Sequence, residues 1–342
     1  MGNRKKKVLL LALRDWNLFE LIVANLEMSG YDVTLVLNQG YKFSYRNFWQ
    51  RLQNLYRKIV FNDKSYKVQL RKKFDNEKQL SIIDRQNAFD YCLVFRADLF
   101  DPHVLNLAKS KSLEFVSYHY DGLSRNNDIF GVIRLFDRFY VFDNKDVLQY
   151  PDLNLFLTTN FYFDNLKFLP KNEEDEKKKL YFLGTYYPGR IDIIMESYEK
   201  LNDLGISLKF ELFFEDKYSS IRESYKRDSV YFLDQILPYR EYLDRVNEAE
   251  VLLDFVISEH NGLSFRIFEG LYFKKKVVTT NSSVRDMDFY HEHNYFVLEN
   301  DNYAELISFL ETPYVEISTE ISEKYSFSNW FRRIFELDVN KG

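Results

Sequence analysis

The sequence predicts an α/β protein made of two Rossmann-like halves, each built on a parallel sheet. Apolar runs of strand length alternate with amphipathic segments of helix length, and this alternation starts again after residue 179. Continuous apolar runs are typical of parallel strands buried on both faces, with helices as the crossover connections. A chain of 342 residues with 46% hydrophobic residues is long enough to bury a core in each half.

The first half is predicted over residues 1–168. Its first apolar run, residues 8–13, is shorter than the hydrophobic region of a secretion signal, so we interpret it as a buried strand of a cytosolic protein. Gly30 ends the first amphipathic segment, as glycine commonly ends helices. The predicted strands are "KVLLLAL", "YDVTLVLN", "DYCLVF" and "LEFVSYHYDG", and the predicted helices are "NLFELIVANLEMSG" and "DPHVLNLAKSKS".

The second half is predicted over residues 175–320, and the charge run "KNEEDEKKK" at 171–179 separates it from the first. Residues 321–342 contain the amphipathic "SFSNWFRRIFEL", a helix that could cross back onto the first domain, and a plain terminal packing helix is favoured over a catalytic role. The predicted strands are "LYFLGTYY", "SLKFELFF", "VLLDFVI" and "KVVTTN", and the predicted helices include "GRIDIIMESYEKLNDLG" and "YREYLDRVNEAE".

Ligands of open parallel sheets bind beyond the carboxyl ends of the strands, so polar residues at those ends are candidates for a site. In the second half, Gly184 and Thr185 follow a strand and precede a helix, where backbone N–H groups can face an anion. Arg190 on the first turn could pair with a phosphate, although an ordinary tight turn explains the pattern equally well. In the first half the strand-end residues are Arg14, Asp15, Arg96, Asp98, His119, Tyr120 and Asp121.

The segment "HNGLSFRIFEGLYFKKKVVTTN", residues 260–281, gives the strongest functional signal. Gly262 permits a close backbone approach, and Ser264 can cap a helix whose positive end would face the ligand. Arg266 adds a full charge for a diphosphate, and the Glu269 carboxylate could accept both hydroxyls of a ribose. The alternative is a surface Arg–Glu ion pair with no function. The apolar neighbours of these two charges argue against it, because burying charges costs free energy.

Several other sites are excluded by their spacing. "GTYYPGR" has Arg190-Ile191 where a P-loop requires Lys-Ser/Thr, and no G-x-G-x-x-G follows the first strand. "HEHNY" lacks a second histidine at helical spacing, and the single cysteine, Cys92, permits neither an intrachain disulfide nor a cysteine-built zinc site. We therefore expect no metal and no bound cofactor.

"NGLSFRIFEGLYFKKKVVTTN" resembles the donor-site segment of GT-B glycosyltransferases, particularly bacterial enzymes of capsule and lipopolysaccharide assembly. "FDYCLVFRADLFDP", "YHYDGLSRNND" and "LFDRFYVFDNKDVLQY" are similar to first-domain segments of that group, so the resemblance covers about residues 85–310. The wider superfamily carries a second glutamate eight residues before the ribose-binding one. Asn261 occupies that position here, and Glu259 lies two residues earlier.

The resemblance implies a GT-B fold whose two sheets face each other across a cleft, and transfer of a sugar from a nucleotide-sugar donor to a growing bacterial surface glycan or lipid-linked glycan. Gly184, Thr185, Arg190, Gly262, Ser264, Arg266 and Glu269 would then bind the donor. An inverting enzyme also needs a general base, for which Asp121 is slightly favoured and Asp15 is next. A nucleotide-sugar epimerase and a non-catalytic binding module are the alternatives.

Residues 42–73 contain ten Lys or Arg and a single acid, Asp63, in a chain of net charge −5. Aromatic residues are interleaved with the basic ones, which suits an anionic membrane surface or single-stranded nucleic acid. The acidic total charge argues against binding to nucleic acid. A solvated basic helix explains the segment about as well as membrane binding does. We expect a cytoplasmic protein that associates peripherally with the inner face of the cell membrane through this segment.

Overall fold

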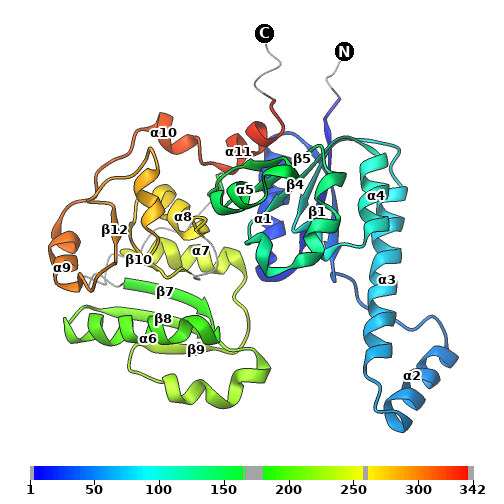
Figure 1. Ribbon diagram of the computed structural model, residues 1–342, viewed down its shortest axis with the longest axis horizontal. Helices are drawn as coiled ribbons and strands as arrows, with labels where there is room; N and C mark the ends of the chain where they lie inside the picture. The colour runs from blue at the N-terminus through cyan, green and yellow to red at the C-terminus, as the bar shows by residue number, and fades with distance from the viewer. Residues whose placement is uncertain (1–3, 165, 167–179, 257–260, 338–342) are drawn as a thin grey trace. The chain divides into compact units, whose positions relative to one another are not determined.

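The computed structural model describes residues 4–164, 166, 180–256 and 261–337. The chain forms two compact units, each built around one six-stranded sheet (Figure 1). The first unit comprises Met1–Tyr140 and Pro151–Phe156, and the second comprises Val141–Tyr150 and Leu157–Gly342. The chain therefore passes between the units more than once. The charge run at 171–179, predicted to separate the two halves, lies outside the described residues.

The sheet of the first unit has the strand order β2-β1-β3-β4-β5-β6, and β1 pairs in parallel with β2 and β3. Its central strands are the continuous apolar runs of the sequence, so both faces are buried, and Cys92 on β3 lies in this core. The strands are β1 (Lys7–Leu13), β2 (Asp32–Asn38), β3 (Phe89–Phe95), β4 (Ser112–His119), β5 (Arg138–Val141) and β6 (Leu155–Leu157). The helices are α1 (Leu18–Met28), α2 (Phe48–Val60), α3 (Ser65–Asp84), α4 (Pro102–Ser110) and the short η1 (Asp15–Asn17), η2 (Ala97–Leu99), η3 (Leu123–Arg125), η4 (Asn127–Gly131), η5 (Ile133–Leu135) and η6 (Pro151–Leu153).

The second sheet has the order β12-β11-β10-β7-β8-β9, and each of its described pairings is parallel. The two parallel sheets confirm the predicted α/β class. The strands are β7 (Leu180–Thr185), β8 (Leu208–Phe213), β9 (Val230–Leu233), β10 (Val251–Asp254), β11 (Lys276–Thr279) and β12 (Tyr295–Val297). The helices are α5 (Asn144–Gln149), α6 (Pro188–Asp203), α7 (Tyr239–Glu248), α8 (Phe265–Phe273), α9 (Tyr303–Glu311), α10 (Thr319–Glu323), α11 (Phe327–Ile334) and the short η7 (Asp216–Tyr225) and η8 (Ser282–Asp286).

The C-terminal helix α11 buries its apolar side on the segment that follows β6. Phe161 packs against Phe327 and Trp330 with ring centroids 5.0 and 4.5 Å apart, and Tyr162 forms a β-bridge with Ser326. All of these residues belong to the second unit. They agree with the predicted packing helix, and a crossing of residues 321–342 back to the first domain stays a prediction.

No helix within the described ranges is long and apolar enough to span a membrane.

Candidate functional site

Helix α8 begins at the carboxyl end of β10 and leads into β11, as the sequence pattern predicts. Its inner side is apolar and fully buried through Ile267 and Phe268. Gly270 lies so close to β11 that an added methyl group would be 2.3 Å from a methyl of Val277. The first turn of α8 is therefore held firmly at the edge of the sheet where the strands end.

Arg266, on this first turn, is held by the strand ends. Its Nη2 donates to the carbonyl of Leu183 on β7 at 2.7 Å, and its Nη1 lies 3.5 Å from Asp254 Oδ1 on β10. The side chain is only 16% exposed, and its guanidinium lies over the Phe182 ring. Arg266 is therefore held by the protein and does not point freely into solvent. Its charge is retained, because Tyr242, Asp254 and Glu269 raise its pKa although burial opposes this.

Asp254 is a buried carboxylate that connects three elements of the site, and sequence reasoning missed it. Besides Arg266, it accepts hydrogen bonds from the hydroxyls of Ser264 and Thr279, both at 2.8 Å. Buried charges are costly unless they are paired, so this acid at the end of an apolar strand was the available signal. Asp254 positions both Arg266 and Ser264.

Glu269 lies one turn further along α8 and is only 2% exposed. Its two carboxylate oxygens accept hydrogen bonds from the hydroxyls of Tyr239 and Tyr242 on α7. Burial raises the pKa of this carboxyl group, and the two tyrosine hydrogen bonds act in the opposite direction. Both oxygens of Glu269 thus already accept hydroxyls, and the predicted binding of a ribose by this buried carboxylate stays a prediction.

Ser264 and Gly262 shape the chain just before α8. Ser264 occupies the position preceding the helix, but its hydroxyl donates to Asp254 instead of capping, which corrects the predicted cap. The close approach predicted at Gly262 is to Phe142, since an added methyl group would lie 2.3 Å from that ring. Asn281 also fixes this turn, donating at 3.0 and 3.3 Å to the carbonyls of Asn261 and Gly262. Glu259 lies outside the described residues.

Gly184 and Thr185 end β7 beside the carbonyl of Leu183 that Arg266 contacts. Arg190 on the first turn of α6 folds back, and its Nη2 donates to the carbonyl of Thr185 at 3.1 Å. An added methyl group at Gly184 would lie 2.7 Å from the Phe182 ring. Two arginines from different helices thus converge on the end of one strand.

The strand ends of the first unit carry a cluster of charges. Arg96 follows β3 with φ at 53°, a left-handed conformation that is strained for a bulky residue. Its guanidinium donates twice to Asp98, at 2.9 and 2.8 Å, and once to Asp121, at 2.8 Å. Arg125 donates to the other oxygen of Asp121 at 2.7 Å. Both oxygens of Asp121, our favoured general base, therefore already accept hydrogen bonds from arginines.

Asp15, the second candidate base, follows β1 in the exposed turn η1. The two residues after it, Trp16 and Asn17, both have positive φ, at 53° and 54°. Burial raises the pKa of the Tyr120 hydroxyl, the charge of Arg96 opposes this, and the charges of Asp15, Asp121 and Asp98 raise the pKa further. The charges of both candidate bases therefore act on the Tyr120 hydroxyl.

His119 ends β4 as a buried imidazole, 1% exposed, that stacks against Phe139. Burial, and then the charge of Arg96, lower its pKa to about 4, whereas a histidine in an unfolded chain titrates near pH ~6.5. The unfolded chain therefore binds this proton more readily, and stability is lost as pH falls from about 6.5 towards 4. We expect about 2 kcal/mol of this loss between pH 7 and 5, measured by urea unfolding.

The variant His119→Asn should lose less stability over the same interval. His103→Asn is the matched control, because His103 is exposed in the same unit and should leave the pH dependence unchanged. Equal pH dependence of the wild type and His119→Asn would contradict a neutral buried His119.

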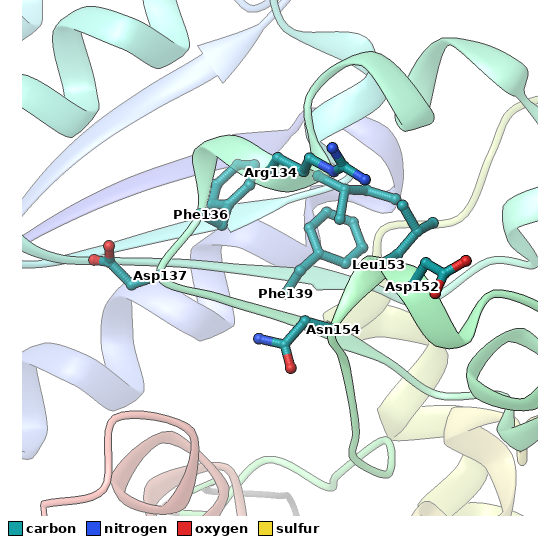
Figure 2. Close-up of a pocket in the computed structure, with 8 residues that line it drawn as sticks. Arg134, Phe136, Asp137, Phe139, Asp152, Leu153 and Asn154 are labelled. Carbon is teal, nitrogen blue, oxygen red and sulfur yellow. The ribbon is translucent and has the colours of Figure 1, made fainter.

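A cavity of about 240 Å³ lies elsewhere in the first unit, beside η5, β5 and η6 (Figure 2). Arg134, Asp137 and Asp152 are its charged lining residues. The Asp137 carboxylate accepts a hydrogen bond from the backbone N–H of Phe115 at 2.8 Å, and this contact gives it a structural role. None of the predicted site residues lines this cavity.

No protein-family model matches the chain, and no curated protein matches it in sequence. Solved structures do match. An α-glucosyltransferase (AGT) in complex with UDP has a TM-score of 0.62 at 12% identity, covering 98% of this chain and 100% of that one. The lipopolysaccharide outer core galactosyltransferase WaaB has a TM-score of 0.52 at 12% identity, covering 97% and 99%. The chain has the GT-B fold.

A third GT-B structure, a mutant of TarM from S. aureus in complex with UDP, fondaparinux and α-GlcNAc-glycerol, matches over 77% of this chain and 58% of its own. Its TM-score is 0.52 at 12% identity. Within the second unit of this GT-B chain, Ser264 and Arg266 both contact Asp254. Arg266 also contacts the end of β7 at Leu183, next to Gly184 and Thr185, and Arg190 contacts Thr185.

Proposed function

We propose that this chain is a glycosyltransferase that transfers a sugar from a uridine-nucleotide donor. The observation that carries the proposal is Arg266, held by Asp254 and Leu183 on the first turn of α8 where three strands end. A fixed cation at a helix N-terminus suits a diphosphate. Support for uridine comes from the AGT and TarM structures, which contain UDP, and from another AGT structure, which contains UDP-glucose.

The proposed chemistry breaks the bond between the donor sugar and the diphosphate and forms a bond to an acceptor hydroxyl. The leaving diphosphate would gain negative charge, which Arg266, Arg190 and the N-terminus of α8 would stabilise. Such donors, already fixed before the reaction, act without reorganisation. Glu269, fixed by Tyr239 and Tyr242, would accept the ribose hydroxyls. We propose that no metal ion is needed, so transfer should persist in EDTA.

For the acceptor we propose a growing bacterial surface glycan, reached by a cytoplasmic protein. The sequence resemblance to capsule and lipopolysaccharide enzymes supports this, and WaaB is by its name a lipopolysaccharide enzyme. AGT is found with DNA in one structure and TarM with α-GlcNAc-glycerol in another. The acceptor panel should therefore include oligosaccharides, lipid-linked glycans and DNA.

The decisive experiment combines a thermal-shift panel with product analysis. UDP should raise the melting temperature more than ADP, GDP or CDP at equal concentration, and a UDP-sugar should then release UDP in the presence of acceptor. A free sugar-nucleotide isomer formed without acceptor would favour an epimerase. Binding without turnover across the acceptor panel would favour a non-catalytic module, and no response to any nucleotide would overturn the proposal.

The two candidate bases give a separate prediction. If the enzyme inverts, removal of the base should lower kcat about 100-fold or more with nucleotide affinity unchanged. Because both oxygens of Asp121 are bound to arginines, we expect this effect from Asp15→Asn, and a smaller effect from Asp121→Asn through the lost arginine contacts. Turnover with each donor–acceptor pair is the measurement. Near-normal turnover of both variants would remove these acids as bases.

A further inference from the structure

Helix α2 is packed with its polar side inward. Figure 1 shows it at the far end of α3, beyond the sheet of the first unit. Its least exposed residues are the polar Gln50, Asn54 and Arg57, which recur at helical spacing on one side. The Asn54 amide donates to the Tyr45 hydroxyl at 3.1 Å, and Arg57 lies over the Tyr66 ring of α3. The contacts that hold this helix are therefore polar.

The opposite side of α2 is apolar and faces solvent. We name it the α2 face. Trp49 and Ile59, near its two ends, are 73% and 72% exposed. No residue of α2 is buried. A soluble helix normally turns such a stripe toward the core, so this arrangement indicates a partner that covers it. The α2 face consists of Phe48, Trp49, Leu52, Leu55, Tyr56 and Ile59.

The segment that contains the α2 face is positively charged. Residues 42–73 carry ten Lys or Arg and one acid, although the chain has a net charge of −5. Arg51 and Lys58 lie seven residues apart, along one flank of the face, and both are exposed. Their long side chains can lie along the apolar surface and place the charges at its border. The charges therefore select an anionic partner.

We propose that the α2 face docks on an anionic lipid bilayer, lying in the interface with its apolar side chains in the acyl region. Apolar burial and basic attraction together are what stable interfacial binding requires. Leu52, Leu55 and Ile59 interrupt the aromatic residues, which suits acyl chains better than the stacked bases of a nucleic acid. The proposal does not depend on the proposed transferase activity.

The test uses the full chain with vesicles of neutral phosphatidylcholine, and of phosphatidylcholine with about 30% phosphatidylglycerol, in sedimentation assays. The protein should bind the anionic vesicles at low salt, release them as salt increases, and bind neutral vesicles much less. Arg51→Gln with Lys58→Gln should weaken binding about 30-fold, since each interfacial charge contributes about fivefold. Arg46 and Arg57 are left unchanged, because Arg46 contacts Glu77 and Arg57 contacts Asp63 and Tyr66.

Trp49→Ser with Ile59→Ser should remove most vesicle binding, and because both side chains are exposed the fold should be retained. Leu113→Ser with Leu148→Ser is the matched control, since these leucines are as exposed but lie outside α2. Unchanged melting temperatures would show that the variants are folded. Absence of binding to anionic vesicles at low salt would overturn the proposal. So would a dimer that the α2 variants dissociate, or oligonucleotide binding that depends on the face when vesicle binding does not.

Discussion

Replacing Arg266 with alanine should raise the dissociation constant for UDP about 10- to 150-fold, equivalent to about 1.5–3 kcal/mol. The physical reason is loss of a fixed cation at the first turn of α8, where a diphosphate would lie. Arg266→Lys should have an intermediate effect, because lysine keeps the charge but cannot make the forked contacts of the guanidinium. Isothermal titration calorimetry on the folded variants measures both.

Because Arg266 is largely buried, its removal also leaves Asp254 with fewer donors and should lower stability. Arg245→Ala is the matched control. Arg245 on α7 pairs with the buried Glu211 in the same unit, so its loss should lower stability without changing UDP affinity. If the Arg266 and Arg245 variants lose stability but both bind UDP normally, Arg266 is a structural residue and not a diphosphate ligand.

Gly262→Ala should lower the free energy of unfolding of the second unit by about 1–3 kcal/mol, the usual cost of overpacking. The added methyl group would lie 2.3 Å from the Phe142 ring, which is buried. The displaced turn carries the chain into Ser264 and Arg266, so UDP affinity should fall as well. Calorimetric melting with and without UDP measures both effects.

The smaller side chain in Phe142→Ala makes room for that methyl group. The double variant, Gly262→Ala with Phe142→Ala, should therefore lose less stability than the summed losses of the two single variants. Additive losses would mean that the contact with Phe142 is not what requires glycine at position 262.

The strand-end rule located much of the candidate site, because parallel strands end at a common edge and the residues that follow them are readable from the sequence. Thr185 and Arg190 were found in this way, whereas Arg266 was found from the segment of residues 260–281. Asp254 was missed because the predicted strand "VLLDFVI" placed it inside an apolar run and not at a strand end, and only the fold brings Ser264 and Thr279 to it. The two tyrosines on Glu269 come from α7, about 30 residues earlier in the chain, and no spacing rule links them.

Short strands were predicted less well than long ones. β5, β6, β9 and β12 have only three or four residues and were not predicted, whereas the equally short β10 and β11 each lie in a longer predicted segment, "VLLDFVI" and "KVVTTN". For α2 the limit was different. The repeat of apolar residues predicts an amphipathic helix but does not say which side faces the protein, and here contacts with Tyr45 and Tyr66 place the polar side inward.

The interleaving of the two units has a consequence for dividing or recombining the chain. A fragment that stops at residue 140 lacks residues 151–156 and with them most of the edge strand β6. A fragment that starts at residue 157 lacks Phe142, which packs on Gly262, and Asp143, whose carboxylate accepts the backbone N–H of Asn261 at 2.6 Å. No single cut yields two intact halves. Exchange of the second unit between relatives, in evolution or in the laboratory, therefore has to include residues 141–150 as well as the segment that starts at residue 157.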